Sequence, residues 1–293
     1  MKEGKRIMYH IILNPDAGKN KKRKVIERVK RVFETRGIAY QVHTGAEIGS
    51  VRSLASSLTE KEKTKLIVIG GDGTLHEALN GVHVENCEMG IIPAGTGNDF
   101  ASAIGLPEKV EEAVSIILDN PSKDTDFLVV GGVRCMNVAG VGIDVDVLNR
   151  YQSAKKRTKF TYFKCLLKSL FSYKGTEIVF EKDGKEERRN AFIAAACNGV
   201  QFGGGIKICP TAETDDGLMD IVVVDFVKGL AVLKALIKLV RGKLLEYKKT
   251  NHFRCESIRF TSPTEMTLQL DGEIYKGLDF DVKIEKGLKI FRR

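Results

Sequence analysis

The sequence predicts an α/β N-terminal domain with a mainly parallel sheet, followed by a larger, mostly antiparallel β C-terminal domain. In the first half, short apolar runs alternate with apolar stripes at helical spacing. After about Asp126, strand-like runs predominate and helices become few. The 293 residues suffice for two domains, because single cores rarely grow beyond about 250 to 300 residues. We therefore expect domains at residues 1–130 and 131–293.

The first domain is expected to open with a strand, a turn and a helix. Residues 8–14 form a short apolar run, and the stripe from Val25 to Phe33 has helical spacing and stops before Gly37. Repeated alternation of this kind favours a parallel sheet with helices on both faces. The further expected elements are strands at 40–43, 66–69 and 90–92, and helices at 51–58, from about 75, and at 110–117.

The second domain is expected to consist mainly of strands interrupted by two helices. We interpret residues 151–173 and 230–242 as the helices, and the latter as an ordinary packed helix. The predicted strands cover residues 127–130, 135–138, 176–181, 191–197, 219–225, 252–261, 267–270 and 280–285.

The composition is that of an ordinary globular protein with excess positive charge. Apolar residues make up 43% and charged residues 29%, and the formal net charge is +9. This charge attracts nucleic acid, nucleotides or acidic membranes without selecting among them. The sequence contains no run of about 18 apolar residues and no signal-peptide pattern. We therefore expect a cytoplasmic protein.

The six cysteines and five histidines are scattered along the chain. No Cys-x-x-Cys pair occurs. We expect reduced, largely buried thiols, and the scatter argues against a zinc site.

The sharpest local feature is Gly70-Gly71-Asp72-Gly73-Thr74, which follows one predicted strand and precedes a predicted helix. Glycines allow backbone amides to approach an anion closely, and a helix N-terminus favours phosphate. A carboxylate beside phosphates calls for a bridging cation, so Asp72 indicates Mg²⁺. A tight strand-to-helix turn is the alternative, at roughly even odds for the glycine loop alone.

Two further glycine-bearing loops follow strands of the same predicted sheet. Residues 14–19 read Asn-Pro-Asp-Ala-Gly-Lys, and residues 93–100 read Pro-Ala-Gly-Thr-Gly-Asn-Asp-Phe. Ligands of parallel sheets bind outside the carboxyl ends of the strands, so the three loops are expected to form one site. There Lys19 could contact phosphate or a carboxylate, and Thr96 could donate its hydroxyl.

These three loops resemble those of the diacylglycerol kinase catalytic domain family. NAD kinases and phosphofructokinases share the Gly-Gly-Asp-Gly-Thr loop, but Asn14-Pro15 with Gly18-Lys19, and residues 95–100, favour lipid kinases. The resemblance implies an NAD kinase/phosphofructokinase-like first domain, an active site in the cleft between the domains, and ATP with Mg²⁺. The nucleotide-binding residues that it implies are Asn14, Pro15, Asp16, Ala17, Gly18, Lys19, Thr44, Gly70, Gly71, Asp72, Gly73, Thr74, Leu75, His76, Glu77, Thr96, Gly97 and Asn98.

The sequence also excludes two common kinase architectures. No Gly-x-x-x-x-Gly-Lys-[Ser/Thr] motif is present, so ATP is not held by a P-loop. The His-Arg-Asp and Asp-Phe-Gly pair of protein kinases is also missing.

An acidic group in the second half is a candidate general base. Asp271-Gly272-Glu273 lies between apolar runs, and composition alone favours a hairpin turn with a solvated glutamate, by roughly two to one. The resemblance reverses this preference, because it implies that Glu273 is the base and that Asp72 is the other catalytic residue. A carboxylate in hydrogen-bond reach could accept the proton of a lipid hydroxyl during phosphoryl transfer.

A second acidic segment covers residues 213–220. Carboxylates and main-chain carbonyls together suit hard cations, although an exposed turn is the plain alternative. The resemblance implies a structural Mg²⁺ held by the side chain of Asp216 and the carbonyls of Glu213 and Leu218. It also implies that Asp126 joins Asp72 in a metal and water network.

Residues 150–174 carry eight basic side chains and no acidic one, with aromatic residues between them. If 160–170 is helical, Phe160 and Phe163 share a face, and Lys164 and Lys168 lie on another. A packed helix with a solvated basic face is favoured a priori, roughly two to one. Contact with an anionic membrane is the alternative that a lipid substrate requires.

The expected function is ATP-dependent phosphorylation of a lipid hydroxyl, with diacylglycerol giving phosphatidic acid. Another lipid alcohol, or a soluble acceptor as in NAD kinases, is the alternative. A nucleic-acid-binding role lacks a recognition motif and leaves Asp72, Asp216 and Glu273 unexplained. The expected partners are a lipid at an anionic membrane and no nucleic acid, with transient peripheral contact at the inner face of the cell membrane and a possible homodimer.

Overall fold

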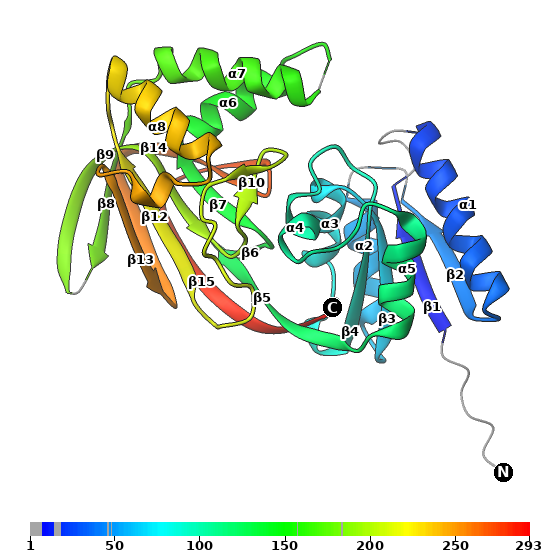
Figure 1. Ribbon diagram of the computed structural model, residues 1–293. Helices are drawn as coiled ribbons and strands as arrows, with labels where there is room; N and C mark the ends of the chain where they lie inside the picture. Colours follow the sequence, from blue (N-terminus) through cyan, green and yellow to red (C-terminus); the bar gives the residue numbers. More distant parts are fainter. Residues whose placement is uncertain (1–7, 15–18, 46, 48, 157, 183) are drawn as a thin grey trace. The chain divides into compact units, whose positions relative to one another are not determined.

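The computed structural model describes residues 8–14, 19–45, 47, 49–156, 158–182 and 184–293. The chain divides into two compact units, and the division falls between Thr125 and Asp126 and again between Glu285 and Lys286. Unit 1 is the part before the first boundary together with Lys286–Arg293, and unit 2 is Asp126–Glu285 (Figure 1). The sequence does not predict the return of the last residues to unit 1.

Unit 1 contains four strands that pair in parallel in the order β2-β1-β3-β4. Side chains on both faces of β1, β3 and β4 are buried, as their continuous apolar runs require, whereas no residue of β2 is buried. Helices α1 and α5 pack together over one face, and α2 packs against α3. The bounds are β1 Met8–Leu13, β2 Ala39–Thr44, β3 Thr64–Gly70, β4 Cys87–Pro93, α1 Lys19–Thr35, α2 Ser50–Thr59, α3 Asp72–Leu79, η1 Val84–Asn86, α4 Asp99–Ala103 and α5 Val110–Asp119.

The last residues of the chain complete unit 1. Strand β15 (Glu273–Phe291) ends beside β4, where Lys289 pairs with Glu88 and Ile290 with Met89 in parallel. Ile290 is fully buried, and Phe291 belongs to the same apolar cluster as α1 and α5. An edge of the sheet is therefore built from residues about 200 positions away along the chain.

Unit 2 is built around antiparallel strands, which confirms the predicted β-rich C-terminal domain. The strands lie in the order β13-β12-β9-β7-β14-β15, with β8 paired to both β9 and β14 and β5 paired to β15 and β6. The bounds are β5 Ser122–Val130, β6 Val133–Cys135, β7 Val138–Gly142, β8 Thr176–Lys182, β9 Lys185–Cys197, β10 Gln201–Phe202, β11 Ile206–Lys207, β12 Met219–Asp225, β13 Thr250–Cys255 and β14 Ser257–Leu270.

Several predicted elements of unit 2 differ from the structure in extent. Residues 151–173 are not one helix, because α6 (Ile143–Gln152) ends and α7 (Lys159–Ser172) begins anew, with Thr158 accepting the amide of Thr161 as its N-cap. The predicted strand at 252–261 is divided between β13 and β14, and those at 267–270 and 280–285 are parts of the longer β14 and β15.

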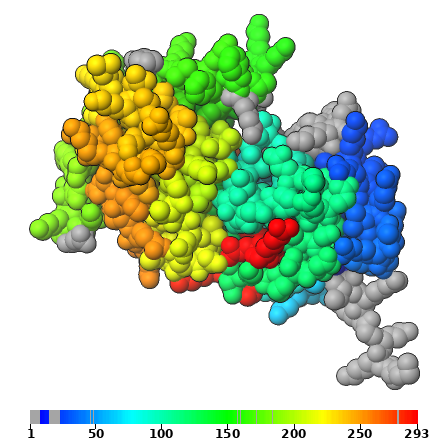
Figure 2. Space-filling view, viewed as in Figure 1, coloured from blue at the N-terminus to red at the C-terminus, as the bar shows by residue number. Residues whose placement is uncertain are grey.

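The prediction of an ordinary packed helix at 230–242 is confirmed for one face only, on which Val232, Leu236 and Leu239 pack in an apolar cluster of unit 2. Helix α8 (Leu230–Val240) buries Val232, but it exposes Leu230 at 79%, Leu233 at 50%, Ile237 at 44% and Val240 at 70%. Its side chains stand at the surface of unit 2 in the space-filling view (Figure 2). Apolar residues therefore lie on a packed face and on an exposed face, and helical spacing alone does not tell which of them meets solvent.

No helix among the described residues has the length and hydropathy that a membrane span requires.

Unit 2 also contains an apolar cluster that its helices enclose. Helices α6, α7 and α8 cover this cluster, which includes Leu166, Leu170 and Val232 together with Val222 and Val224 of β12.

Candidate active site

The parallel register brings the predicted phosphate loops of unit 1 to one edge of the sheet. Leu13 pairs with Ile69, and Ile69 pairs with Ile92. The residues that follow these positions therefore leave their strands at the same level, and the amide of Ala94 donates to the carbonyl of Gly70 at 2.8 Å.

The loops after β3 and β4 touch through their backbones. A Cβ atom added to Gly95 would lie 2.4 Å from the Cα of Gly71, and one added to Gly71 would lie 2.8 Å from the Cα of Gly95. Neither backbone could yield without moving its strand, so this approach requires glycine on both sides. Asn98, which has a left-handed φ of 54°, accepts the amide of Gly95 through its side chain at 2.8 Å.

Asp72 joins these two loops. It lies in the first turn of α3, where its carboxylate oxygens accept the amides of Asn98 at 2.9 Å and Asp99 at 2.8 Å. A carboxylate offers about four lone-pair sites, so it can accept several partners at once. Asp72 can therefore both stabilise the strand-to-helix turn and bind a cation. That it binds Mg²⁺ stays a prediction.

The other predicted nucleotide-binding residues of unit 1 differ in exposure. Leu75 and His76 are each 5% exposed, whereas Gly73, Thr96 and the β2 terminus at Thr44 are exposed. The half-buried members of the set are Asn14, Gly71, Asp72, Thr74, Glu77, Gly97 and Asn98, while Gly70 is buried. Pro15, Asp16, Ala17 and Gly18 lie outside the described residues, as does the side chain of Lys19.

Glu273 lies at a hairpin turn, as composition alone predicts. Asp271 and Gly272 have φ values of 50° and 93°, and Leu270 pairs with Glu273 across this two-residue turn. Glu273 is exposed at the start of β15. A hairpin and a proton acceptor are therefore compatible, because the turn presents the carboxylate to solvent; its catalytic role stays a prediction.

Asp271 organises the backbone beside Glu273, a role that the sequence does not reveal. Its carboxylate accepts the amides of Met136 at 2.7 Å and Asn137 at 2.9 Å and the thiol of Cys135 at 3.2 Å. Burial and the nearby carboxylate raise the pKa of the Cys135 thiol well above its usual range. These partners are more than 130 positions away, so no local pattern could have indicated them.

Asn198 is a second residue that sequence reasoning missed. It is fully buried, and its amide group donates to the carbonyl of Asp126 at 2.8 Å and to that of Met136 at 2.6 Å. Asn198 therefore fixes the segment after β6 to the start of unit 2. Its only signal in the sequence is a polar residue directly after a long apolar strand.

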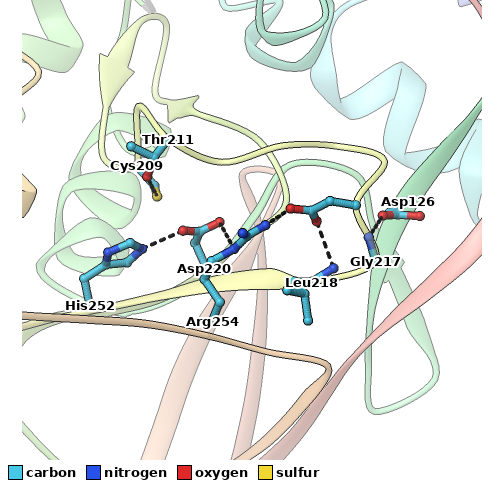
Figure 3. Close-up of polar contacts among 9 residues, drawn as sticks. Asp126, Cys209, Thr211, Gly217, Leu218, Asp220, His252 and Arg254 are labelled. Atoms are coloured by element: carbon cyan, nitrogen blue, oxygen red, sulfur yellow. Dashed lines mark hydrogen bonds and ion pairs between the residues drawn. The ribbon is translucent and has the colours of Figure 1, made fainter.

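Asp126 on β5 contacts the turn that contains the other predicted metal ligands of unit 2, and Figure 3 shows it beside Gly217 and Leu218 of that turn. Asp126 is 2% exposed; its carboxylate accepts the amide of Gly217 at 2.7 Å, and its own amide donates to the carbonyl of Thr214 at 2.7 Å. Asp216 accepts the amide of Leu218 at 2.9 Å. Gly217 and Thr214 both belong to unit 2, and the predicted network of Asp126 with Asp72 stays a prediction.

Asp216 already has a cationic partner, because the guanidinium of Arg254 forms an ion pair with its second carboxylate oxygen. A Mg²⁺ ion at this side chain would have to displace Arg254. Glu213 is exposed and Leu218 is half-buried, and both flank the turn. The donor atoms suit a hard cation, but the guanidinium competes for the carboxylate, and the structural Mg²⁺ stays a prediction.

Comparison with known proteins decides the family. The sequence profile of the diacylglycerol kinase catalytic domain matches residues 8–130, and that of the YegS C-terminal NAD kinase beta sandwich-like domain matches residues 137–289. The chain belongs to the diacylglycerol kinase family. This membership confirms the resemblance in the three loops.

Members of the family match over most of their length. The diacylglycerol kinase of Staphylococcus carnosus (strain TM300) is 30% identical over 274 residues, covering 90% of this chain and 87% of that protein. The diacylglycerol kinase of Bacillus subtilis (strain 168) is 28% identical over 275 residues, covering 92% and 90%.

Solved structures support the same fold. A crystal structure from Bacillus anthracis strain Sterne matches with a TM-score of 0.80 at 22% identity, covering 98% of each chain. A diacylglycerol kinase structure from the same strain matches with a TM-score of 0.72 at 20% identity, covering 98% of this chain and 97% of that one.

Proposed function

We propose that the chain is an ATP-dependent lipid kinase that phosphorylates diacylglycerol to phosphatidic acid. The observation that carries this proposal is the pair of glycine loops clamped by Asp72 at the N-terminus of α3, in a chain of the diacylglycerol kinase family. Closely approaching backbones and a helix N-terminus favour the phosphates of Mg²⁺-bound ATP, which is a substrate of the reaction.

In the proposed reaction, Glu273 accepts the proton of the lipid hydroxyl. The lipid oxygen then bonds to the γ-phosphorus, the bond from that phosphorus to the bridging oxygen breaks, and ADP leaves. Glu273 suits this role because it is exposed on a turn that Asp271 fixes through two backbone amides. Asp72 would hold the phosphate loops in place and carry negative charge beside the metal-bound nucleotide.

The test is transfer of labelled γ-phosphate from ATP to liposomes that contain diacylglycerol, with sphingosine and NAD as other acceptors. Glu273→Gln should lower kcat by roughly 100-fold or more, the usual contribution of a general base, and Asp72→Ala should abolish transfer. Glu265→Gln, at an exposed glutamate of β14, is the matched control and should leave the rate unchanged.

Each outcome of this assay has a distinct meaning. If sphingosine or NAD carried the label and phosphatidic acid did not, the labelled compound would be the acceptor and diacylglycerol would not. Labelling of none of the three would contradict the kinase proposal. Equal rates for the wild type and Glu273→Gln would remove that residue as the base.

We further propose that α8 and the N-terminal part of α7 contact the inner face of an anionic membrane. Lys234 and Arg241 are exposed among the apolar side chains of α8. On α7, Phe160 is 66% and Phe163 43% exposed, and the ammonium of Lys164 lies 4.5 Å from the ring centroid of Phe160. Apolar side chains interspersed with basic ones suit the boundary between headgroups and acyl chains.

Charge reversal tests this contact. A basic residue near an anionic surface contributes about 1 kcal/mol, so Lys164→Glu with Lys168→Glu should weaken liposome binding by roughly 30-fold or more. Leu233→Gln with Ile237→Gln should weaken it as well. Lys61→Glu with Lys63→Glu, at exposed positions of unit 1, is the control. Unchanged sedimentation of both α7 and α8 variants with liposomes would contradict the proposal.

A further inference from the structure

Three potential metal ligands of different chemistry meet at an edge of unit 2. They are Cys209 in the loop after β11, Asp220 on β12 and His252 on β13 (Figure 3). One ligand atom from each lies within 4.8 Å of the other two. The scatter of cysteines and histidines along the sequence conceals this group, because it is assembled from three separate segments.

Strand register explains the assembly. In the antiparallel pair of β12 and β13, Asp220 lies opposite Arg254 and Val222 opposite His252, so Asp220 and His252 are diagonal neighbours on one face. The Nε2 atom of His252 lies 2.5 Å from Oδ1 of Asp220. Cys209 is held over this face by its amide, which donates to the carbonyl of Val200 at 3.2 Å, and its thiol contacts Asp220.

The carboxylate of Asp220 is enclosed and incompletely satisfied. Its side chain is 1% exposed, and no described residue donates a hydrogen bond to Oδ2. The nearest cation is Arg254, whose Nε atom lies 3.8 Å away and whose guanidinium also pairs with Asp216. Two carboxylates therefore share one guanidinium, although a buried carboxylate usually requires a full set of partners.

We propose that Cys209, Asp220 and His252 form a zinc site. Thiolate, imidazole and carboxylate are the donors that Zn²⁺ takes in proteins, with bonds of about 2.0 to 2.3 Å, so neighbouring donors are about 3.3 to 3.7 Å apart. To reach these values, His252 and Asp220 must move apart by about 1 Å. Any separation from the Cys209 sulfur that lies near the 4.8 Å limit must shorten by about the same amount. Binding displaces the thiol proton of Cys209 and the proton between Nε2 of His252 and Oδ1 of Asp220. The thiol proton leaves to solvent, and the proton on Nε2 is lost to solvent or replaced by one on Nδ1, so that the neutral ring binds through Nε2.

This site differs from the hard-cation site predicted at Asp216. A thiolate and an imidazole select zinc over Mg²⁺, which prefers oxygen donors. Cys197 lies opposite Asp220 on β9, so a further thiol borders the site. The bound ion would tie the loop after β11 to β12 and β13, just ahead of the turn that carries Asp216.

Cobalt and zinc binding test the proposal independently of kinase activity. With the full chain in excess Mg²⁺, Co²⁺ should produce a thiolate-to-cobalt absorption band and the visible spectrum of a tetrahedral ion, and about one equivalent of Zn²⁺ should abolish both. Cys209→Ser should remove the thiolate band, and His252→Asn should weaken Zn²⁺ binding by roughly tenfold or more. Cys165→Ser, a partly buried thiol on α7, should match the wild type.

If a variant fails to fold, the spectrum of the wild type with Co²⁺ still tests the proposal. Absence of the thiolate band in the wild type would overturn the site. A band that persists in Cys209→Ser would place the metal elsewhere and overturn it as well.

Discussion

Asp72 has a structural role that its substitution should reveal. Asp72→Asn keeps the size and shape of the side chain. Its NH₂ group, which cannot accept a hydrogen bond, would face one of the two backbone N–H groups that now donate to the carboxylate. Because one partly buried donor would lose a charged partner, we expect the free energy of unfolding to fall by about 1 to 3 kcal/mol.

Urea denaturation measures this change. Asp124→Asn, at an exposed carboxylate paired with Lys289, should cost less than about 1 kcal/mol. An Asp72→Asn variant as stable as the wild type would show that the two hydrogen bonds contribute little.

Asp144 should make stability fall as the pH rises. Complete burial raises its pKa to about 7, well above about 3.9 in the unfolded chain. The folded chain thus binds more protons between these values, so stability is greatest at low pH and is lost as the pH rises through about 7.

The effect should be visible as a difference between the wild type and Asp144→Asn. From pH 5 to pH 8 the wild type should lose about 2 to 3 kcal/mol relative to the variant, which cannot ionise. Urea denaturation across this range measures the difference. A difference that does not change with pH would show that Asp144 titrates normally.

At the scale of elements, the β14–β15 hairpin should depend more on Asp271 than on Glu273. Asp271→Ala leaves the amides of Met136 and Asn137 without their acceptor, so we expect a loss of about 2 to 4 kcal/mol in stability. Glu273→Ala removes an exposed side chain and should change stability by less than about 0.5 kcal/mol. Thermal unfolding of the two variants side by side measures this contrast, and equal losses would contradict it.

Local chemistry explains which elements could be predicted. The Gly70–Thr74 turn and the Asp-Gly hairpin depend on residues adjacent in sequence, so glycine and turn preferences suffice to predict them. The partners of Asp271 and the pairing of Asp216 with Arg254 depend on strand register over long separations. The exposed stripe of α8 was missed because helical periodicity does not tell which environment the apolar face meets.

At the scale of the whole molecule, a substitution near the C-terminus should weaken unit 1. Ile290 is fully buried and pairs with Met89 of β4, so Ile290→Ala should cost about 2 to 5 kcal/mol. Hydrogen exchange should speed up in β3 and β4. Ile284→Ala, on the same strand but packed in unit 2, should instead speed up exchange in β14. Faster exchange confined to unit 2 in Ile290→Ala would contradict this assignment.

The pairing of β15 with β4 also sets an order of events during synthesis. On the ribosome, β1 to β4 emerge long before residues 286–293, yet the buried positions beside β4 are filled only by those last residues. Until residues 286–293 emerge, β4 lacks its pairing with β15, and an open strand edge invites association with other chains. We expect the nascent first unit to need protection by chaperones and to reach its final stability only after residues 286–293 have left the ribosome.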